Sequence, residues 1–412
     1  MSKFVINKSS LLFIILVLLP ISNMISVPVL GYADELLAIW GILYILLNIK
    51  KLNYSRYIKR LVLLICMLLG IGLFSNWYAR YVTDAKTILL DFFLIAKPYV
   101  VFIGCLLLKQ SYKDNIINKL FPLCKIMLCV LFTCSVITQF QDIGMTLEID
   151  KVGPLTIHIF GFIWKNGIQT AWLTIICYAC ILSCEVKTKK LRFYTVAYFV
   201  TLLTIWGGFV SIMFLSSAAF LYYFKNDKKA KLNFWQLGLC AVAGGVFAFG
   251  DITRYLSNSY APRALYIKYG IVTANRFFPF GAGIGTYGSE MANRLYSPLY
   301  YEYGFNSIWS MSPTSIENQF TTLYDNYIAM IFGEYGWMGF LIFCIFLVTI
   351  FIVINKSNTT GNRKAIALSM FITLFATMLV SATSKSTMGV MTFALIGLLI
   401  KNSKKEPENY SI

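Results

Sequence analysis

Charged side chains gather in one long polar stretch, residues 252–334, within an otherwise apolar second half of the chain. Four arginines fall in this stretch, at Arg254, Arg263, Arg276 and Arg294. A planar guanidinium stays charged at any relevant pH and donates two parallel hydrogen bonds to phosphate oxygens. Several of them together would suit a diphosphate at a membrane surface. Alternatively, each arginine is an ordinary loop residue that is exposed to solvent and binds no diphosphate.

The same stretch supplies carboxylates that could act as a general base toward a hydroxyl group. They are Glu290, Glu302, Glu317, Asp325 and Glu334. Asp325 and Glu334 stand out because they flank the point where the chain returns to an apolar run. The alternative for both is an interfacial or helix-capping role.

A glycine-rich run, GAGIGTYG at residues 281–288, lies between these groups. Its letters resemble a dinucleotide fingerprint, but no strand-helix-strand unit is predicted around it, so that interpretation fails. A turn at Gly283 and Gly285 could still let backbone N–H groups approach a phosphate. Plain tight turning is the alternative.

Two ionisable residues, Asp91 and Lys97, interrupt an apolar run near residues 88–108. Such groups are costly at membrane depth and are functional candidates by default. A structural ion pair, or a lysine that reaches toward the interface, is the alternative.

Few residues in the sequence could bind a metal or support histidine catalysis. His158 is the only histidine, which excludes a histidine metal cluster and leaves a histidine triad only if His158 folds over the 252–334 stretch. Cys177, Cys180 and Cys184 have a spacing that resembles a metal motif. That spacing is also one face of a helix in an apolar run, and we expect packing cysteines and no metal.

Composition fixes the elements that must position these residues. Hydrophobic residues make up 58% of the 412 residues and charged residues only 13%, far from the balance of a soluble domain. Only helices or closed barrels satisfy their backbone in lipid, and a helix needs about 20 apolar residues to cross. The apolar runs predict an all-α polytopic membrane protein with about twelve transmembrane helices in a single domain, residues 1–412. The predicted spans are 9–29, 35–49, 61–78, 88–108, 121–139, 167–184, 193–207, 209–224, 234–251, 335–355, 365–382 and 387–400.

Lysine and arginine predict the orientation, because these residues are retained in cytoplasmic loops during insertion. If the amino terminus lies inside, the connections predicted to be cytoplasmic carry a higher density of these residues than the predicted outer loops. Both termini are therefore expected in the cytoplasm, and the net charge of +18 needs no nucleic acid to explain it. Two long segments fall on the opposite side: a smaller outer loop, residues 140–166, and a large outer loop, residues 252–334. Binding and chemistry tend to sit on such loops.

The large outer loop resembles the characteristic part of the bacterial O-antigen polymerase and ligase superfamily, the Wzy-type proteins. The resemblance covers the hydropathy of the whole chain and the motifs of its second half. The matching pieces are residues 262–264 (PRA), 278–289 (FPFGAGIGTYGS), 296–300 (YSPLY) and 325–339 (DNYIAMIFGEYGWMG).

The resemblance implies a metal-independent membrane glycosyltransferase with a GT-C-like bundle and a catalytic large outer loop. Such enzymes work at the outer face of the bacterial cytoplasmic membrane on oligosaccharides linked to undecaprenyl diphosphate. This protein is expected to join such repeats into a surface polysaccharide, whether O-antigen, capsule or exopolysaccharide, without a cofactor. A chain-length regulator and a flippase are the protein partners that the resemblance suggests.

By the same resemblance, Arg263 holds the diphosphate, and Asp325 or Glu334 orients or deprotonates the acceptor hydroxyl. Ligases of the superfamily usually carry histidine where Asp325 stands, which favours a polymerase. Many members also carry an arginine after a serine near the seventh and eighth helices. This sequence reads WGGFVSI at residues 206–212, so Arg254 or Arg276 is expected to complete the diphosphate site.

Two other functions stay open from the sequence. The first is a ligase that transfers finished polymer to a lipid acceptor. The second is a flippase or transporter of lipid-linked oligosaccharide, which would account for many helices and for Lys97. A transporter needs no large outer loop and usually shows internal repeats, which are not evident here.

Overall fold

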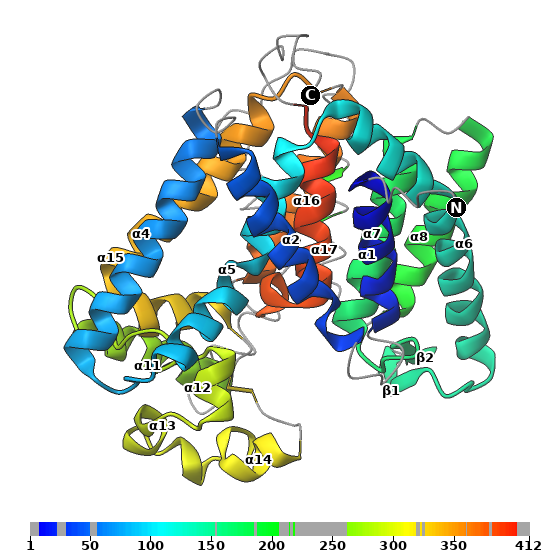
Figure 1. Ribbon diagram of the computed structural model, residues 1–412. Helices are drawn as coiled ribbons and strands as arrows, with labels where there is room; N and C mark the ends of the chain where they lie inside the picture. Colours follow the sequence, from blue (N-terminus) through cyan, green and yellow to red (C-terminus); the bar gives the residue numbers. More distant parts are fainter. Residues whose placement is uncertain are drawn as a thin grey trace, which may run out of the picture.

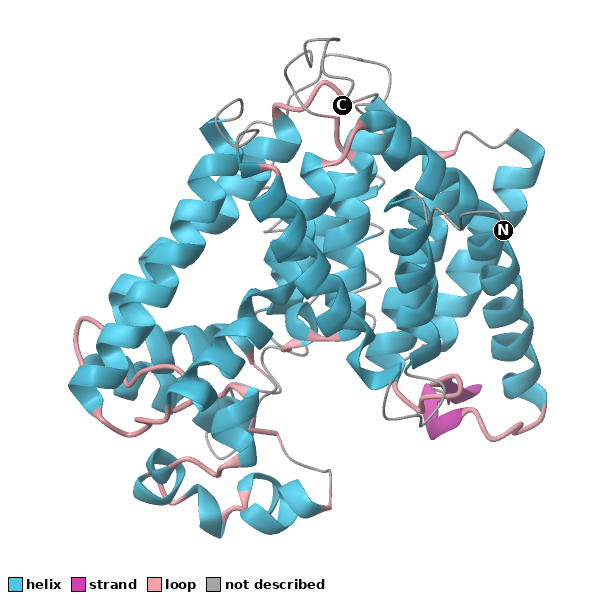
Figure 2. Cartoon of the chain, viewed as in Figure 1, coloured by secondary structure: helices cyan, strands magenta, loops and turns pink. Residues whose placement is uncertain are grey.

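A computed structural model describes residues 8–22, 30–49, 56–152, 155–184, 188–205, 214, 217–218, 262–318, 322–323, 326–359, 361–378 and 381–401. Within these residues the chain is mostly helical (Figures 1 and 2). The predicted spans 209–224 and 234–251 lie outside them, apart from three isolated positions. Every other predicted span contains a helix.

The first half of the chain contributes long apolar helices. They are α1 (Lys8–Ser22), α2 (Ala33–Leu47), α4 (Arg56–Ala79), α5 (Ala85–Leu107), α6 (Gln110–Phe140), α7 (Gly167–Ser183) and α8 (Thr188–Thr204), with a short 3-10 turn, η1 (Leu30–Tyr32), before α2. Polar side chains begin several of them. Asp84 accepts from the backbone N–H groups of Lys86 and Thr87 at the start of α5, as expected for an N-cap.

The second half adds three more long helices. These are α15 (Tyr327–Asn355), α16 (Gly361–Met378) and α17 (Thr387–Leu399), and a 3-10 turn, η4 (Thr383–Lys385), joins the last two. Among the described residues, α4, α5, α6 and α15 are long and apolar enough to cross a membrane. They indicate a membrane-embedded protein.

Helix α5 is the central element. From Ile95 to Leu107 every residue on it is buried, because α2 and α17 pack against it. Lys113, at the start of α6, is also buried, and its ammonium group donates to the carbonyl oxygens of Leu106, Gly397 and Ile400. These carbonyls end α5 and α17, where a cation satisfies acceptors that the helices leave open.

The described part of the large outer loop is folded. It contains α11 (Pro262–Arg276), α12 (Glu290–Arg294), α13 (Pro298–Glu302), η2 (Phe305–Ser307), η3 (Trp309–Met311) and α14 (Pro313–Glu317). Tyrosines dominate its own small core, which includes Tyr266, Tyr287, Tyr296 and Tyr300 and packs on Ala329 of α15. The loop is therefore a compact unit resting on the bundle.

The smaller outer loop holds an antiparallel hairpin of β1 (Thr146–Val152) and β2 (Leu155–Phe160). The sequence analysis expected no strand. The alternation of Leu147 and Ile149 with Glu148 and Asp150 is the period-two signal that could have predicted it.

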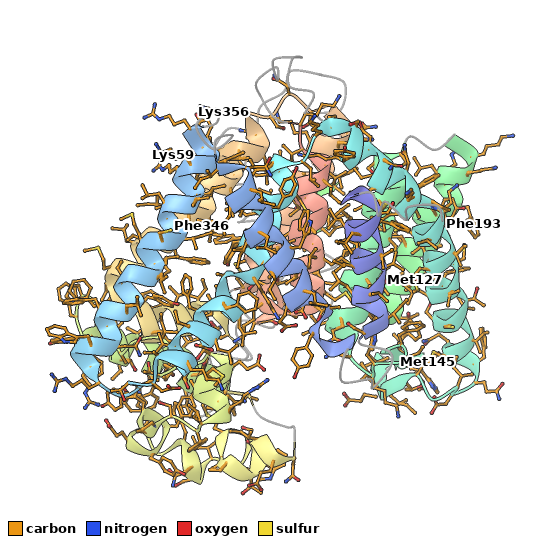
Figure 3. All side chains as sticks on the ribbon, viewed as in Figure 1. Lys59, Met127, Met145, Phe193, Phe346 and Lys356 are labelled. Atoms are coloured by element: carbon orange, nitrogen blue, oxygen red, sulfur yellow. The ribbon has the colours of Figure 1, made fainter. Side chains whose placement is uncertain are left out.

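The connections predicted on one side of the membrane do lie at one end of the molecule. The hairpin and helices α12 to α14 are at the lower end in Figure 1. Lys59 and Lys356, which belong to predicted cytoplasmic segments, lie together at the opposite end (Figure 3). Which end faces the cytoplasm stays a prediction from the distribution of basic residues.

Candidate functional site

The glycine turn, residues 277–289, links α11 to α12 and is bonded to the start of α15. The backbone N–H of Ala282 donates to Gly333 O, and that of Gly283 donates to Glu334 O, both at 2.9 Å. Beyond the kink in α15, Met338 N–H donates to Pro279 O at 3.0 Å. The turn therefore crosses α15 and is held on both sides of its kink.

Glycine is required where the two backbones meet. Gly281 has φ 79° and Gly336 has φ 61°, values that side-chain-bearing residues rarely adopt. A Cβ on either glycine would collide with the backbone of the other. Gly336 interrupts the helical geometry of α15, so the kink and the turn fit together as one feature. The span predicted from the sequence begins at residue 335, whereas α15 begins at Tyr327 and is interrupted at Gly336.

Glu334 is the side chain around which the turn closes. It is fully buried, and its Oε1 accepts from the backbone N–H of Gly285 at 2.9 Å and of Tyr287 at 3.3 Å. Successive backbone N–H groups of this kind form an anion-binding concavity. Here the anion is the protein's own carboxylate. Its second oxygen, Oε2, is buried without a hydrogen-bond partner among the described residues.

Asn76 fastens the other face of the turn to α4. Its Oδ1 accepts from Ile284 N–H at 2.8 Å, and its Nδ2 donates to Ile284 O at 2.9 Å. A third bond runs from Nδ2 to Val82 O at 3.1 Å. An amide side chain is the group that can donate and accept toward one peptide in this way, so the side-chain chemistry matches the contact.

Asp91 reaches the same place from α5. It is fully buried, its Oδ1 accepts from Met291 N–H at 3.1 Å, and its charge interacts with that of Glu334. Ser289, the N-cap residue of α12, lies beside both carboxyl groups. Buried ionisable groups that converge in this way are a candidate functional site on physical grounds.

Lys97 does not belong to this cluster. Six positions along a helix place it on a different face from Asp91. Its ammonium group pairs with Asp34 at 2.5 Å and Glu35 at 3.2 Å, at the start of α2. Lys97 and Asp91 are thus parts of two separate buried clusters, and the structure gives Lys97 an ion-pairing role.

Arg276 is engaged by a carboxylate at the surface of the large outer loop. Its guanidinium pairs with Glu302 Oε2 at 2.5 Å and lies over the ring of Phe277, while Tyr81 donates to Glu302 Oε1 at 2.8 Å. The hydrogen bond from Arg276 lowers the pKa of Glu302. Burial, together with the bond to Glu302, raises the pKa of Tyr81 to about 12. The charge of Arg276 is therefore already compensated.

The remaining predicted residues are less completely placed. Arg263 lies in the first turn of α11, and its side chain is outside the described structure. Arg254 and Asp325 lie outside the described residues. The structure therefore brings together Glu334, Asp91, Gly283 and Gly285, and separates Arg276 and Lys97 from them.

The N–H groups of Gly283 and Gly285, expected from the sequence to approach a phosphate, donate within the protein in this structure. Both groups donate to acceptors of Glu334, one to its backbone and one to its side chain. No N–H of these two glycines is left for a ligand. The alternative from the sequence, a tight turn, describes them.

His158 lies away from the site, on β2. Its backbone N–H and C=O both bond to the side chain of Gln139 of α6. The hairpin and helices α12 to α14 lie on different sides of the molecule in Figure 1. His158 does not fold over the described part of the large outer loop.

Two site residues were missed by the sequence analysis. Asn76 lies in an apolar span that raised no interest, although a lone amide at membrane depth is itself a signal. Lys385 donates to Gly288 O at 3.2 Å from η4. Lys385 could have been noticed in the sequence as a lysine between two apolar spans, on the predicted outer side.

Comparison with protein-family models and with curated proteins gives no match to this chain.

Proposed function

We propose that this protein is a membrane glycosyltransferase that polymerises oligosaccharide repeats linked to undecaprenyl diphosphate. Under this proposal it has about twelve spans in a GT-C-like bundle, with both termini in the cytoplasm. The reaction takes place at the outer face of the bacterial cytoplasmic membrane. The product is a surface polysaccharide.

One observation carries the proposal. Two of the motifs behind the resemblance, residues 278–289 and 325–339, are far apart in the sequence but are bonded to each other through Gly283 and Glu334. Their glycines, Gly281 and Gly336, fit one another backbone to backbone. Motifs that fold into a single unit at the junction of bundle and outer loop are what a shared catalytic scaffold requires.

The proposed chemistry assigns a role to each side chain. The acceptor hydroxyl attacks the anomeric carbon of the donor sugar, and the bond from that carbon to the diphosphate breaks. The diphosphate leaves with the bonding electrons, and its growing charge needs cations such as Arg263. The hydroxyl proton passes to a carboxylate, for which Asp325 is the candidate. The buried Glu334 positions the glycine turn instead.

Deletion of the gene in its host, with gel analysis of the surface polysaccharide, tests the proposal. A single capped repeat without the ladder of longer chains is the expected result. An intact ladder stranded on undecaprenyl diphosphate would replace the proposal with a ligase. A wild-type pattern would reject both.

The buried group of Lys97, Asp34 and Glu35 gives a specific reason to keep a transporter as the second candidate. Ionisable groups inside a bundle often mark the path of an ion or substrate. In that case the deletion would remove every repeat from the outer face while lipid-linked repeats accumulate inside.

A further inference from the structure

We infer that Lys385 is a positioning residue that seats the large outer loop on the bundle through a cluster of opposite charges with Asp91 and Glu334. The inference concerns how the loop is held, and it goes beyond the reaction proposed above. The seat is defined as the contact between residues 285–291 of the loop and Asp91, Glu334 and Lys385.

Three separate parts of the bundle meet the loop at the seat. Asp91 comes from α5, Glu334 from α15 and Lys385 from η4, between α16 and α17. Each of them bonds to the backbone of residues 285–291. Asp91 and Glu334 accept from Met291, Gly285 and Tyr287, and Lys385 donates to Gly288 O. Residues 285–291 are therefore held by two hydrogen-bond acceptors and one donor that come from three separate elements of the bundle.

The bonds are chemically matched to the backbone they hold. The carboxylates accept from N–H groups of residues 285–291, and the ammonium group donates to a carbonyl oxygen of the same segment. Charged partners strengthen such bonds relative to neutral ones. Because the seat is buried, each lost partner would also leave a desolvated backbone group behind.

Lys385 is the cation that balances the buried carboxylates. Its charge interacts favourably with those of Asp91, Glu290 and Glu334. Burial lowers the pKa of Lys385, and these three carboxylates oppose the decrease. The positive charge of Lys385 and the negative charges of these carboxylates therefore stabilise each other.

A second lysine near the seat, Lys97, has ion-pair partners of its own. Lys97 acts on Lys385 only by repulsion and is paired with Asp34 and Glu35. Glu290 is paired with Arg294 at 2.7 Å. Without Lys385, however, the fully buried Asp91 and Glu334 would have no compensating lysine from η4. An uncompensated buried charge is strongly destabilising. A carboxyl group that takes up a proton instead loses the charge that strengthens its bonds to the loop backbone, so in either case the loop should be held less tightly.

A cysteine reporter in the turn tests the inference. Thr286 is fully buried, so Thr286→Cys in the full-length protein in native membranes should resist a membrane-impermeant maleimide. Adding Lys385→Met should raise the labelling rate by roughly a hundredfold, equivalent to about 2.8 kcal/mol. The same forms without Thr286→Cys measure labelling of the native cysteines.

A double variant that removes one charge of each sign tests whether the seat is held by electrostatic attraction or by packing alone. Asp91→Asn retains the oxygen that accepts from Met291, and combining it with Lys385→Met removes one charge of each sign. The pair should restore most of the protection or, if Lys385→Met alone fails to accumulate, restore accumulation. Lys356→Met is the matched control, because Lys356 lies at the far end of the bundle beside Tyr57 (Figure 3).

Two results would overturn the inference. One is protection of Thr286→Cys in Lys385→Met equal to that in the parent. The other is a double variant no better protected, or no better accumulated, than Lys385→Met alone. Both readouts are independent of polysaccharide synthesis, so a wild-type polymer pattern in the gene deletion would reject the polymerase and leave the seat intact.

Discussion

The backbone N–H of Gly285 lies 2.9 Å from Glu334 Oε1, across 49 residues of sequence. That bond places a buried carboxylate where a glycine turn offers anion-binding groups. It also explains why Glu334 is suited to holding the turn rather than to meeting a substrate.

Glu334→Ala should destabilise the folded protein. The change leaves the N–H groups of Gly285 and Tyr287 buried without an acceptor, at a cost of about 1 to 3 kcal/mol for each group. Glu334→Gln keeps a carbonyl oxygen as acceptor and should lose less. The measurement is the temperature at which purified protein in detergent loses its monodisperse fraction. Equal temperatures for wild type and Glu334→Ala would show that the contact does not stabilise the turn.

The contact between Gly281 and Gly336 leads to a graded set of glycine substitutions. Gly336→Ala combines a left-handed φ with a backbone collision and should prevent stable accumulation in the membrane. Gly304→Ala has φ 71° but open space around it, so a smaller loss, on the order of 1 kcal/mol, is expected. Gly70→Ala, on α4 with nothing within 4 Å, should be neutral or stabilising. Normal accumulation of Gly336→Ala would contradict the close fit.

Within the described residues, hydropathy predicted where helices form, because the length of an apolar run is a local property. The helix boundaries and the kink were less predictable. The start of α15 at Tyr327 depends on the Asn326 side chain, which accepts from Ala329 N–H, and on packing against α11. Neither contact can be read from hydropathy.

The candidate site was predictable by residue type but not by partner. Glu334 and Asp91 were singled out from the sequence as ionisable residues in or beside apolar runs. Their shared turn could not be foreseen, because it is closed by contacts between residues far apart in the sequence, from 47 positions for Tyr287 and Glu334 to 208 for Ile284 and Asn76. The same reason hid Asn76 and the pairing of Lys97 with α2.

Lys97 should be required for stable insertion because it neutralises buried carboxylates. Lys97→Met leaves Asp34 without its partner, a type of change that costs about 3 to 5 kcal/mol. Combining it with Asp34→Asn removes both charges and should recover much of the loss. The amount of full-length protein in the membrane and its thermal stability are the measurements. If the double variant were as poor as Lys97→Met, ion pairing would not be the role of Lys97.

The surface pair of Arg276 and Glu302 should show a weak, pH-dependent coupling. Both side chains are more than a third exposed, so a double-mutant cycle with Arg276→Ala and Glu302→Gln should give no more than about 1 kcal/mol at neutral pH. The pKa of Glu302 is lowered in the folded protein. The contribution is therefore complete above the ordinary pKa of glutamate, 4.5, and is lost as the pH falls through the lowered value. A coupling that persisted after Glu302 was protonated would contradict the ion pair.

Arg263 provides the sharpest test of the proposed diphosphate site. Arg263→Ala should abolish polymer while the protein remains in the membrane, and Arg263→Lys should also be poor, because a point charge does not reproduce the bidentate fork of a guanidinium. Lys268→Ala, an exposed cation on the same helix, is the matched control and should leave polymer length unchanged. The measurement is gel analysis of the surface polysaccharide, with the protein detected in the membrane fraction. Polymer of normal length from Arg263→Ala would move the diphosphate site away from α11.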